Sequence, residues 1–175
     1  MSTPSVNLSV LVGKNFACVK ITGRANFSSS PDFKTLLTEL MQKGYGHFIM
    51  DLSECALMDS TFLGTLAQFG LKLNGAGAGK PPGIELLNCN TRVTELLENL
   101  GALNLFKTLS GALTLPDDVR TCTPESIHPT HEQITRTSLE AHQTLMAINP
   151  ENVARFKDVA QFLAEDLKSI ERCAE

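Results

Sequence analysis

The sequence contains no Trp and only one Tyr, Tyr45, among its 175 residues. An array of exposed aromatic rings for stacking nucleic-acid bases is therefore not expected. The formal net charge of −4 at pH 7 also disfavours binding to a phosphate backbone or to an anionic membrane surface. Composition thus argues against nucleic acid as a partner.

Long apolar runs and metal-ligand spacings are missing as well. No run approaches the roughly 18 apolar residues that span a bilayer, and no basic segment followed by an apolar core opens the chain. The odd number of cysteines, at positions 18, 55, 89, 122 and 173, includes no C-x-x-C pair, and three lie in or beside apolar runs, where Cys packs as a small hydrophobe. His128 and His131 have no close Cys or carboxylate set to complete a metal site. We expect a cytoplasmic protein with reduced thiols, no membrane span, no metal and no other cofactor.

Charge divides the chain into two regions. Residues 1–115 hold nine Lys/Arg and eight Asp/Glu, whereas residues 116–175 hold six and eleven. The sequence predicts an α/β domain over 1–115, a linker over 116–128 and a helical hairpin over 129–175, with an acidic solvated surface on the second region.

Strand and helix patterns alternate through the first region. Ser30-Pro31 predicts a helix start that leads to a stop at Gly44, and Asn90 or Thr91 caps a helix that stops at Gly101. A further helix starts at Asp59-Ser60. The predicted strands are Val6–Val12, Phe16–Thr22, 47–52, Ile84–Cys89 and Leu103–Leu109. This order predicts a mixed α/β sheet of four to five strands, mostly parallel inside, with packed helices.

Residues 74–83 form a glycine- and proline-rich connector that resembles a phosphate-binding loop only superficially. Asn74 occupies the first glycine position of that motif and Pro81 occupies its Ser/Thr position. The segment also follows a predicted helix instead of a strand. A flexible connector between helix and strand is the preferred interpretation.

The C-terminal region predicts two antiparallel helices. Ile127, His131, Ile134, Ser138, Ala141, Leu145 and Ile148 recur at alternating spacings of four and three, and the same alternation runs from Val153 to Ile170. Asn149-Pro150-Glu151 separates the two stretches with a cap, a first-position Pro and an acidic first turn. Such a pair leaves one apolar side to cover. Packing on the parent domain and formation of a homodimer through these helices both remain open.

The stretch from Met50 to Gly64 contains the candidate functional residues. Asp59-Ser60-Thr61 stands where a helix begins, so Asp59 or Ser60 can cap the first turn. Alternatively, Ser60 is a hydroxyl displayed for modification. A role as enzyme nucleophile would require a nearby base, and His47 lies about a strand length from Ser60.

These residues resemble the STAS domain of bacterial anti-sigma-factor antagonists. The likeness covers roughly residues 4–112 and rests on Asp51-Leu52-Ser53, a gap of five residues, and Asp59-Ser60-Thr61-Phe62-Leu63-Gly64 in this order of elements. Phe62 stands where the family usually has Gly. Asn26 stands in a turn where an acidic residue is common.

The resemblance implies a non-enzymatic regulatory protein. Its partner would be an anti-sigma factor with Ser/Thr kinase activity, or a related regulator, and a phosphatase would reverse the modification. Ser60 is then the expected phosphoacceptor, with Thr61 as a second, weaker candidate. The expected partner-binding surface comprises Asp59, Ser60, Thr61, Phe62, Gly64 and Asn26.

Two alternatives remain beside this interpretation. One is a constitutive scaffold or oligomerisation module driven by the C-terminal helices. The other is a STAS protein that binds a small ligand, a lipid or an anion, for which a pocket is required.

Overall fold

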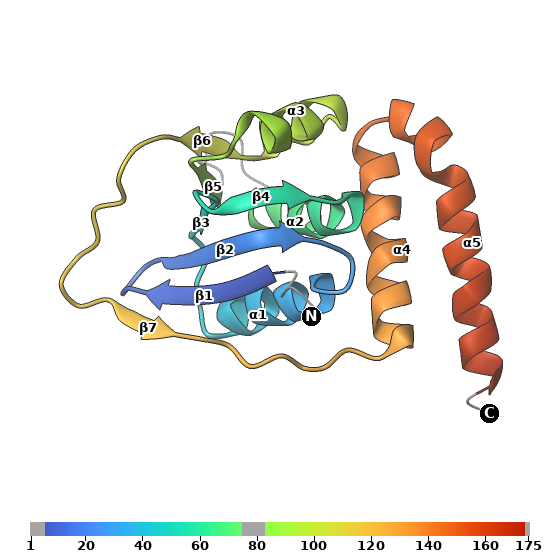
Figure 1. Cartoon of the computed structure of the whole chain (residues 1–175), viewed down its shortest axis with the longest axis horizontal. Helices are drawn as coiled ribbons and strands as arrows, with labels where there is room; N and C mark the ends of the chain where they lie inside the picture. The colour runs from blue at the N-terminus through green and yellow to red at the C-terminus, as the bar shows by residue number, and fades with distance from the viewer. Residues whose placement is uncertain (1–5, 75–82, 174–175) are drawn as a thin grey trace.

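A mixed sheet carries helices α1 and α2 on one face, and the last two helices stand across one end of it (Figure 1). The computed structural model describes residues 6–74 and 83–173. Its strands are β1 (Val6–Val12), β2 (Ala17–Ala25), β3 (Phe48–Asp51), β4 (Cys55–Met58), β5 (Ile84–Leu87), β6 (Lys107–Leu109) and β7 (Arg120–Cys122). Its helices are α1 (Ser30–Gln42), α2 (Ser60–Asn74), α3 (Thr91–Asn99), the short 3-10 helix η1 (Leu103–Leu105), α4 (His131–Ile148) and α5 (Glu151–Cys173).

Strand β2 is the centre of the sheet. The order is β6-β5-β3-β2-β1-β7, and β4 also pairs with β2. β1 pairs antiparallel with β2 and β7, whereas β3, β4, β5 and β6 join in parallel ladders. β2 is long enough to pair first with β3, at Cys18 and Ile49, and then with β4, at Ala25 and Met58. The chain therefore enters α2 at the same edge where β2 ends.

The predicted α/β class and the C-terminal helices are confirmed, with differences in detail. Within the described residues the sheet has seven strands, where four to five were expected. The additional β4 is only four residues long, and the predicted strand 103–109 is split into η1 and β6. Helix α1 begins at Ser30 after Ser29, whose side chain makes no cap bond, while Asn90 does cap α3 through the N–H of Val93.

The segment expected as a linker, 116–128, contributes an edge strand. β7 pairs with Val10–Val12 of β1, and the Asp32 carboxylate accepts hydrogen bonds from the Ile127 N–H and the Ser126 hydroxyl. β7 is short, polar and exposed, so it has no apolar alternation that would reveal a strand. Residues 75–82 of the predicted connector lie outside the described residues.

Aromatic and aliphatic side chains fill the space between the sheet and helices α1 and α2. Phe33 of α1 packs on Phe62 of α2 with ring centroids 4.6 Å apart, and on Phe69 at 6.3 Å. All three rings are fully buried, as are Phe48 and Met50 of β3. This core fixes the rotation of α2, so the neighbouring positions Ser60, Thr61 and Gly64 face away from it.

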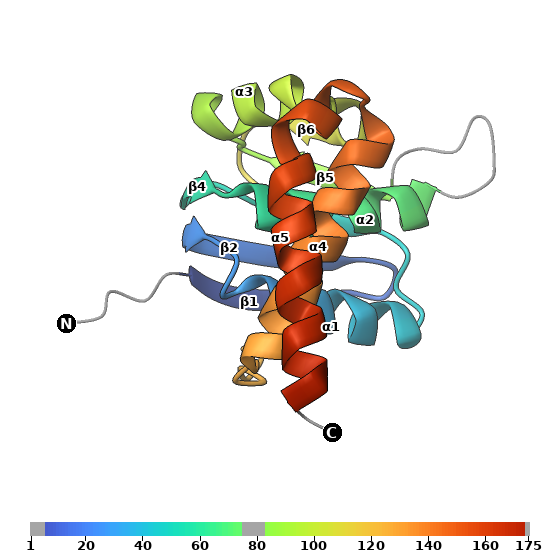
Figure 2. The same ribbon diagram turned by 90° about the vertical axis from the view of Figure 1, so that its right-hand side faces the viewer.

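Helix α4 packs on that second face of α2 (Figures 1 and 2). The two backbones approach closely at Gly64, where an added Cβ would lie 2.5 Å from the Ala141 carbonyl oxygen and 2.7 Å from its Cβ. Leu145 is fully buried in the main core. Helix α5 forms the outer layer, with α4 between it and the sheet domain.

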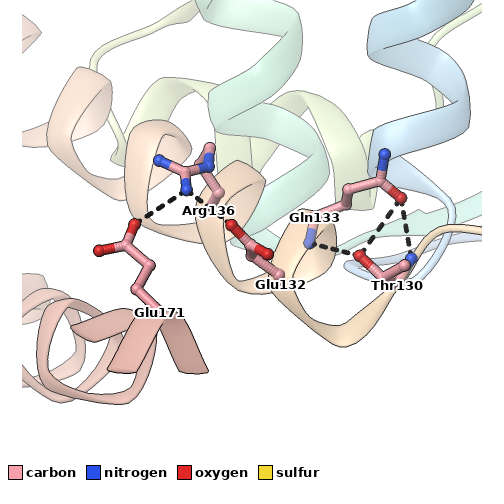
Figure 3. Close-up of polar contacts among 5 residues, drawn as sticks. All are labelled: Thr130, Glu132, Gln133, Arg136 and Glu171. Carbon is pink, nitrogen blue, oxygen red and sulfur yellow. Dashed lines mark hydrogen bonds and ion pairs between the residues drawn. The ribbon is translucent and has the colours of Figure 1, made fainter. Parts of the chain in front are cut away.

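Polar contacts hold the two C-terminal helices in place. The Asn152 side chain of α5 donates to the carbonyls of Leu100 and Leu145, each at 2.8 Å. At the other end of the hairpin, Arg136 donates to Glu132 on its own helix and to Glu171 on α5 (Figure 3). The same view shows the capping box that begins α4, which pairs Thr130 with Gln133.

The hairpin therefore folds back on its own domain, one of the two arrangements that the sequence left open. Homodimer formation through these helices stays a prediction. In residues 6–74 and 83–173, no helix is long and apolar enough to cross a membrane.

The contact at Gly64 makes a stability prediction. Gly64→Ala should lower the free energy of unfolding by about 1–3 kcal/mol, because its Cβ would collide with the α4 backbone. Helix propensity alone would raise the free energy of unfolding by about 1 kcal/mol. Urea denaturation therefore distinguishes the collision from the propensity effect by the sign of the change. Gly46→Ala is the control, because a Cβ there meets nothing within 4 Å. A Gly64→Ala variant as stable as wild type would refute the close packing.

Candidate functional site

Asp59 connects three elements at the carboxyl end of β4. Its N–H donates to the Ala25 carbonyl at the end of β2, at 3.0 Å. Its carboxylate accepts the Phe62 N–H of the first turn of α2, at 2.9 Å, and the Phe27 N–H, at 2.7 Å. Asp59 is therefore the residue that caps α2, as a carboxylate at a helix start should.

The turn that follows β2 is held by its own polar side chains. The Asn26 side-chain oxygen accepts from the N–H and the hydroxyl of Ser28, at 3.1 and 2.7 Å. The Asn26 carbonyl accepts from the hydroxyls of Ser29 and Ser30, both at 2.9 Å. These bonds leave the Phe27 ring 52% exposed beside Asp59. The amide thus builds an ordered turn at the position where a carboxylate was expected.

Ser60 meets a histidine from the C-terminal region. Its hydroxyl lies 2.9 Å from His142 Nε2, and His142 Nδ1 lies 2.7 Å from the Ser138 carbonyl. A carbonyl only accepts, so the ring proton belongs on Nδ1, and Nε2 of the neutral ring accepts from the Ser60 hydroxyl. The His142 ring is 4% exposed and stands edge-on to Phe156 of α5 at 5.0 Å. A backbone carbonyl, in place of the carboxylate of a catalytic triad, orients this histidine.

The other predicted surface residues lie deeper than Ser60. Thr61 is 4% exposed and its hydroxyl lies 2.8 Å from that of Ser138. Phe62 points into the core, and Gly64 lies beneath α4. The structure thus brings Asp59, Ser60 and the Asn26 turn together at one end of the sheet, whereas Thr61, Phe62 and Gly64 are buried against neighbouring elements.

A cavity of about 550 Å³ opens beside Ser60. It lies between the start of α2, the exposed Phe27 ring and the two C-terminal helices. Its apolar lining is Phe27, Ile134, Phe156, Val159, Phe162 and Leu163, and its polar lining is Asp59, Ser60, Thr61, His131, Thr135, Ser138, His142, Arg155 and Asp166. The site therefore combines a modifiable hydroxyl with space for an added group.

Sequence reasoning did not assign His142 and Ser138 to this site. The sequence analysis assigns no role to His142, although Ser138 and Ala141 lie on the predicted apolar face of the same helix. Small and polar residues on such a face signal a close, hydrogen-bonded neighbour, but they do not name it. The neighbour is α2, more than 70 residues earlier in the chain.

A second cavity lies between β1, β7 and helix α1. It measures about 390 Å³, and its walls include Val10, Val12, Leu36 and Leu40. Its lining also includes the charged side chains Asp32, Glu39 and Lys43, and binding of a small ligand stays a prediction. Among the residues described, no group of three His, Cys, Asp or Glu side chains is placed to hold a metal ion.

The two buried thiols, those of Cys18 and Cys55, behave as packing groups. All five cysteines are free, and Cys18 and Cys55 are buried in the sheet. Burial raises the pKa of each of these two thiols to about 11, so both stay protonated at neutral pH and are poor nucleophiles.

Asp59 gives a pH-dependent prediction. Burial raises its pKa above the ordinary value, against the opposing effects of the Phe62, Phe27 and Thr61 N–H groups. The folded state then binds this proton more tightly than the unfolded state. The stability that results is complete below the unfolded pKa and is lost as pH rises through the folded pKa.

Asp59→Asn removes this titration. The unfolding free energy of wild type minus that of Asp59→Asn should therefore fall as pH rises from about 3 to 7, measured by urea denaturation. Asp158→Asn, on the exposed side of α5, controls for the lost charge. A difference that grows with pH would show that the site favours the ionised carboxylate.

Comparison with solved structures shows the same fold over about 60% of the chain. An anti-sigma factor antagonist from Mycobacterium paratuberculosis is 19% identical, with a TM-score of 0.52, and the match covers 62% of this chain and 90% of that one. A protein from Thermotoga maritima, described as an anti-sigma factor antagonist, is 17% identical, with a TM-score of 0.51 over 59% of this chain and 86% of that one. A search of curated protein sequences gave no match.

The family comparison places the match on the chain. The STAS domain model matches residues 7–114, which include all of β1 except its first residue, the strands from β2 to β6 and the start of α2. Helices α4 and α5 lie beyond the match and supply His142, the partner of Ser60. By its sequence and by its fold, the chain belongs to the STAS domain family.

Proposed function

We propose that this protein is a non-enzymatic regulator of the anti-sigma factor antagonist kind, which binds a partner protein under the control of Ser60 phosphorylation. One observation carries the proposal. In a STAS domain, a half-buried serine hydroxyl stands at the first residue of α2, beside an open cavity.

Ser60 suits a phosphoryl group better than its neighbour does. The start of a helix accommodates negative charge locally, so the modified domain should stay folded. Thr61 is almost fully buried and its hydroxyl is paired with Ser138. A kinase can therefore reach Ser60 with less disruption, and Thr61 remains the weaker candidate.

The proposed partner surface surrounds Ser60. It comprises the Asn26–Ser28 turn, Asp59 and Ser60, together with the exposed side of α5 next to the cavity. Phe27 and Phe162 are 52% and 68% exposed there, and exposed apolar rings of this kind are common at protein interfaces. Phe62 and Gly64 lie beneath this surface, where Phe62 fixes the position of α2 and Gly64 allows α4 to pack closely on it.

The switch acts through charge. Phosphorylation adds nearly two negative charges at neutral pH. Burying that charge in an interface that had packed against a neutral hydroxyl costs several kcal/mol, or about two to three decades in affinity. The partner is proposed to be an anti-sigma factor with Ser/Thr kinase activity or a related regulator, and a phosphatase would restore the binding form.

Phosphate mapping tests this proposal. The full chain is incubated with ATP and an anti-sigma factor that has Ser/Thr kinase activity, and mass spectrometry locates the phosphate. Modification is expected at Ser60, and Ser60→Ala should lose it. Ser53→Ala, in the exposed β3–β4 turn, is the matched control and should be modified as wild type is.

Binding of the partner supplies the second readout. By calorimetry, the phosphorylated protein should bind about 100- to 1,000-fold more weakly than the unmodified one. If Ser60→Ala is phosphorylated as well as wild type, Ser60 is not the switch. Equal binding by both forms would instead favour the constitutive scaffold.

A further inference from the structure

Two basic side chains, His142 and Arg155, line the cavity beside Ser60. The proposed function assigns no role to either of them. We infer that they form a receptor for the phosphate on Ser60 and that phosphorylation thereby locks helices α4 and α5 onto the STAS domain. This inference rests on the proposed function in taking Ser60 as the modified residue.

His142 is already in contact with the atom to be modified. In the unmodified protein, Nε2 accepts the Ser60 hydroxyl proton at 2.9 Å. Phosphorylation removes that proton, so the Nε2 lone pair would face phosphate oxygens. Uptake of a proton by the ring converts this repulsion into an N–H donor to an anion, a charge-assisted hydrogen bond.

The surroundings of His142 tolerate the imidazolium form. Nδ1 keeps its proton and its bond to the Ser138 carbonyl at 2.7 Å, so both ring N–H groups would have acceptors. The Phe156 ring meets the imidazole edge-on and carries no charge. Phosphorylation together with proton uptake by His142 then adds only about one net negative charge to the site.

Arg155 supplies a second donor from a different helix. It lies on the exposed side of α5 and lines the same cavity as Ser60. Its hydrogen bond to the Asn99 carbonyl is long, at 3.4 Å, so turning to a phosphate costs little. A guanidinium matches phosphate geometry through paired N–H groups.

Three other titratable groups face the cavity. The Asp59 carboxylate accepts from the Phe62 and Phe27 N–H groups. Asp166 of α5 lies 3.1 Å from His131 Nε2 and 3.5 Å from the Thr135 hydroxyl. Both carboxylates thus have donors of their own, which limits their repulsion of the phosphate. His131 is engaged with Asp166, so it is not part of the receptor.

The phosphate would link the first residue of α2 to α4 through His142 and to α5 through Arg155. Among the described residues of the unmodified form, the hydrogen bonds between α2 and α4 are the neutral Ser60–His142 bond and the Thr61–Ser138 pair. The hairpin should therefore open less often after phosphorylation. A partner that must displace it would be excluded from the modified form, in the direction the proposed switch requires.

Hydrogen exchange of the full chain tests this inference. Phosphoserine is incorporated at position 60 during translation, so that the result does not depend on any kinase. Backbone amides of residues 131–148 are expected to exchange about tenfold more slowly than in the unmodified protein at pH 7, the effect of one added charge-assisted bond. Unchanged or faster exchange in α4 would overturn the inference, whatever phosphate mapping finds at Ser60.

Matched variants identify the receptor. His142→Phe should abolish most of the slowing, and Arg155→Gln should reduce it, whereas His131→Gln should retain it. The exchange rate of each phosphorylated variant is compared with that of the same variant without phosphate, so a loss of overall stability does not affect the comparison. Retention of the full slowing in both His142→Phe and Arg155→Gln would show that these residues do not hold the phosphate.

Discussion

The close approach of α4 to α2 at Gly64 is the constraint on which the site depends. With no side chain at Gly64, the Ala141 backbone can lie against α2. Thr61 and Ser138, each three residues before the contact on its own helix, then come within hydrogen-bond distance. Ser60 likewise reaches His142, the residue that follows Ala141. The family motif and the C-terminal hairpin thus form one site, because a single glycine lets two helices touch.

Asp59 fixes the start of α2 on the side of the sheet. By bonding to the Phe62 and Phe27 N–H groups, its carboxylate holds the helix start against the turn after β2. A movement of that turn would therefore also move Ser60, the residue that follows Asp59. The core ring of Phe62, packed on Phe33, keeps α2 from rotating. Charge placed on Ser60 must consequently be absorbed by groups outside the core, of which His142 is the nearest.

Local patterns predicted most of the fold, and tertiary contacts account for what they missed. The strand before Asp51, the cap at Asp59, the stop at Gly44 and the restart at Asn149-Pro150 are each local features, and all lie at or next to an element boundary. β4 and β7 were missed because four- and three-residue strands take their stability from the neighbour with which they pair. Phe62 was assigned to the partner surface from its position in the motif, yet the helical period turns it toward Phe33. His142 could not be paired with Ser60, since no local pattern gives the direction in which a hairpin folds back.

A double-mutant cycle between Ser60 and His142 tests the central claim, that the C-terminal helices complete the serine site in solution. The unfolding free energies of wild type, Ser60→Ala, His142→Phe and the double variant give the coupling energy of the pair. A hydrogen bond across the helices predicts a coupling of about 1 kcal/mol or more. Additive effects, with a coupling below about 0.3 kcal/mol, would contradict the contact and remove the basis for a switch that involves the hairpin.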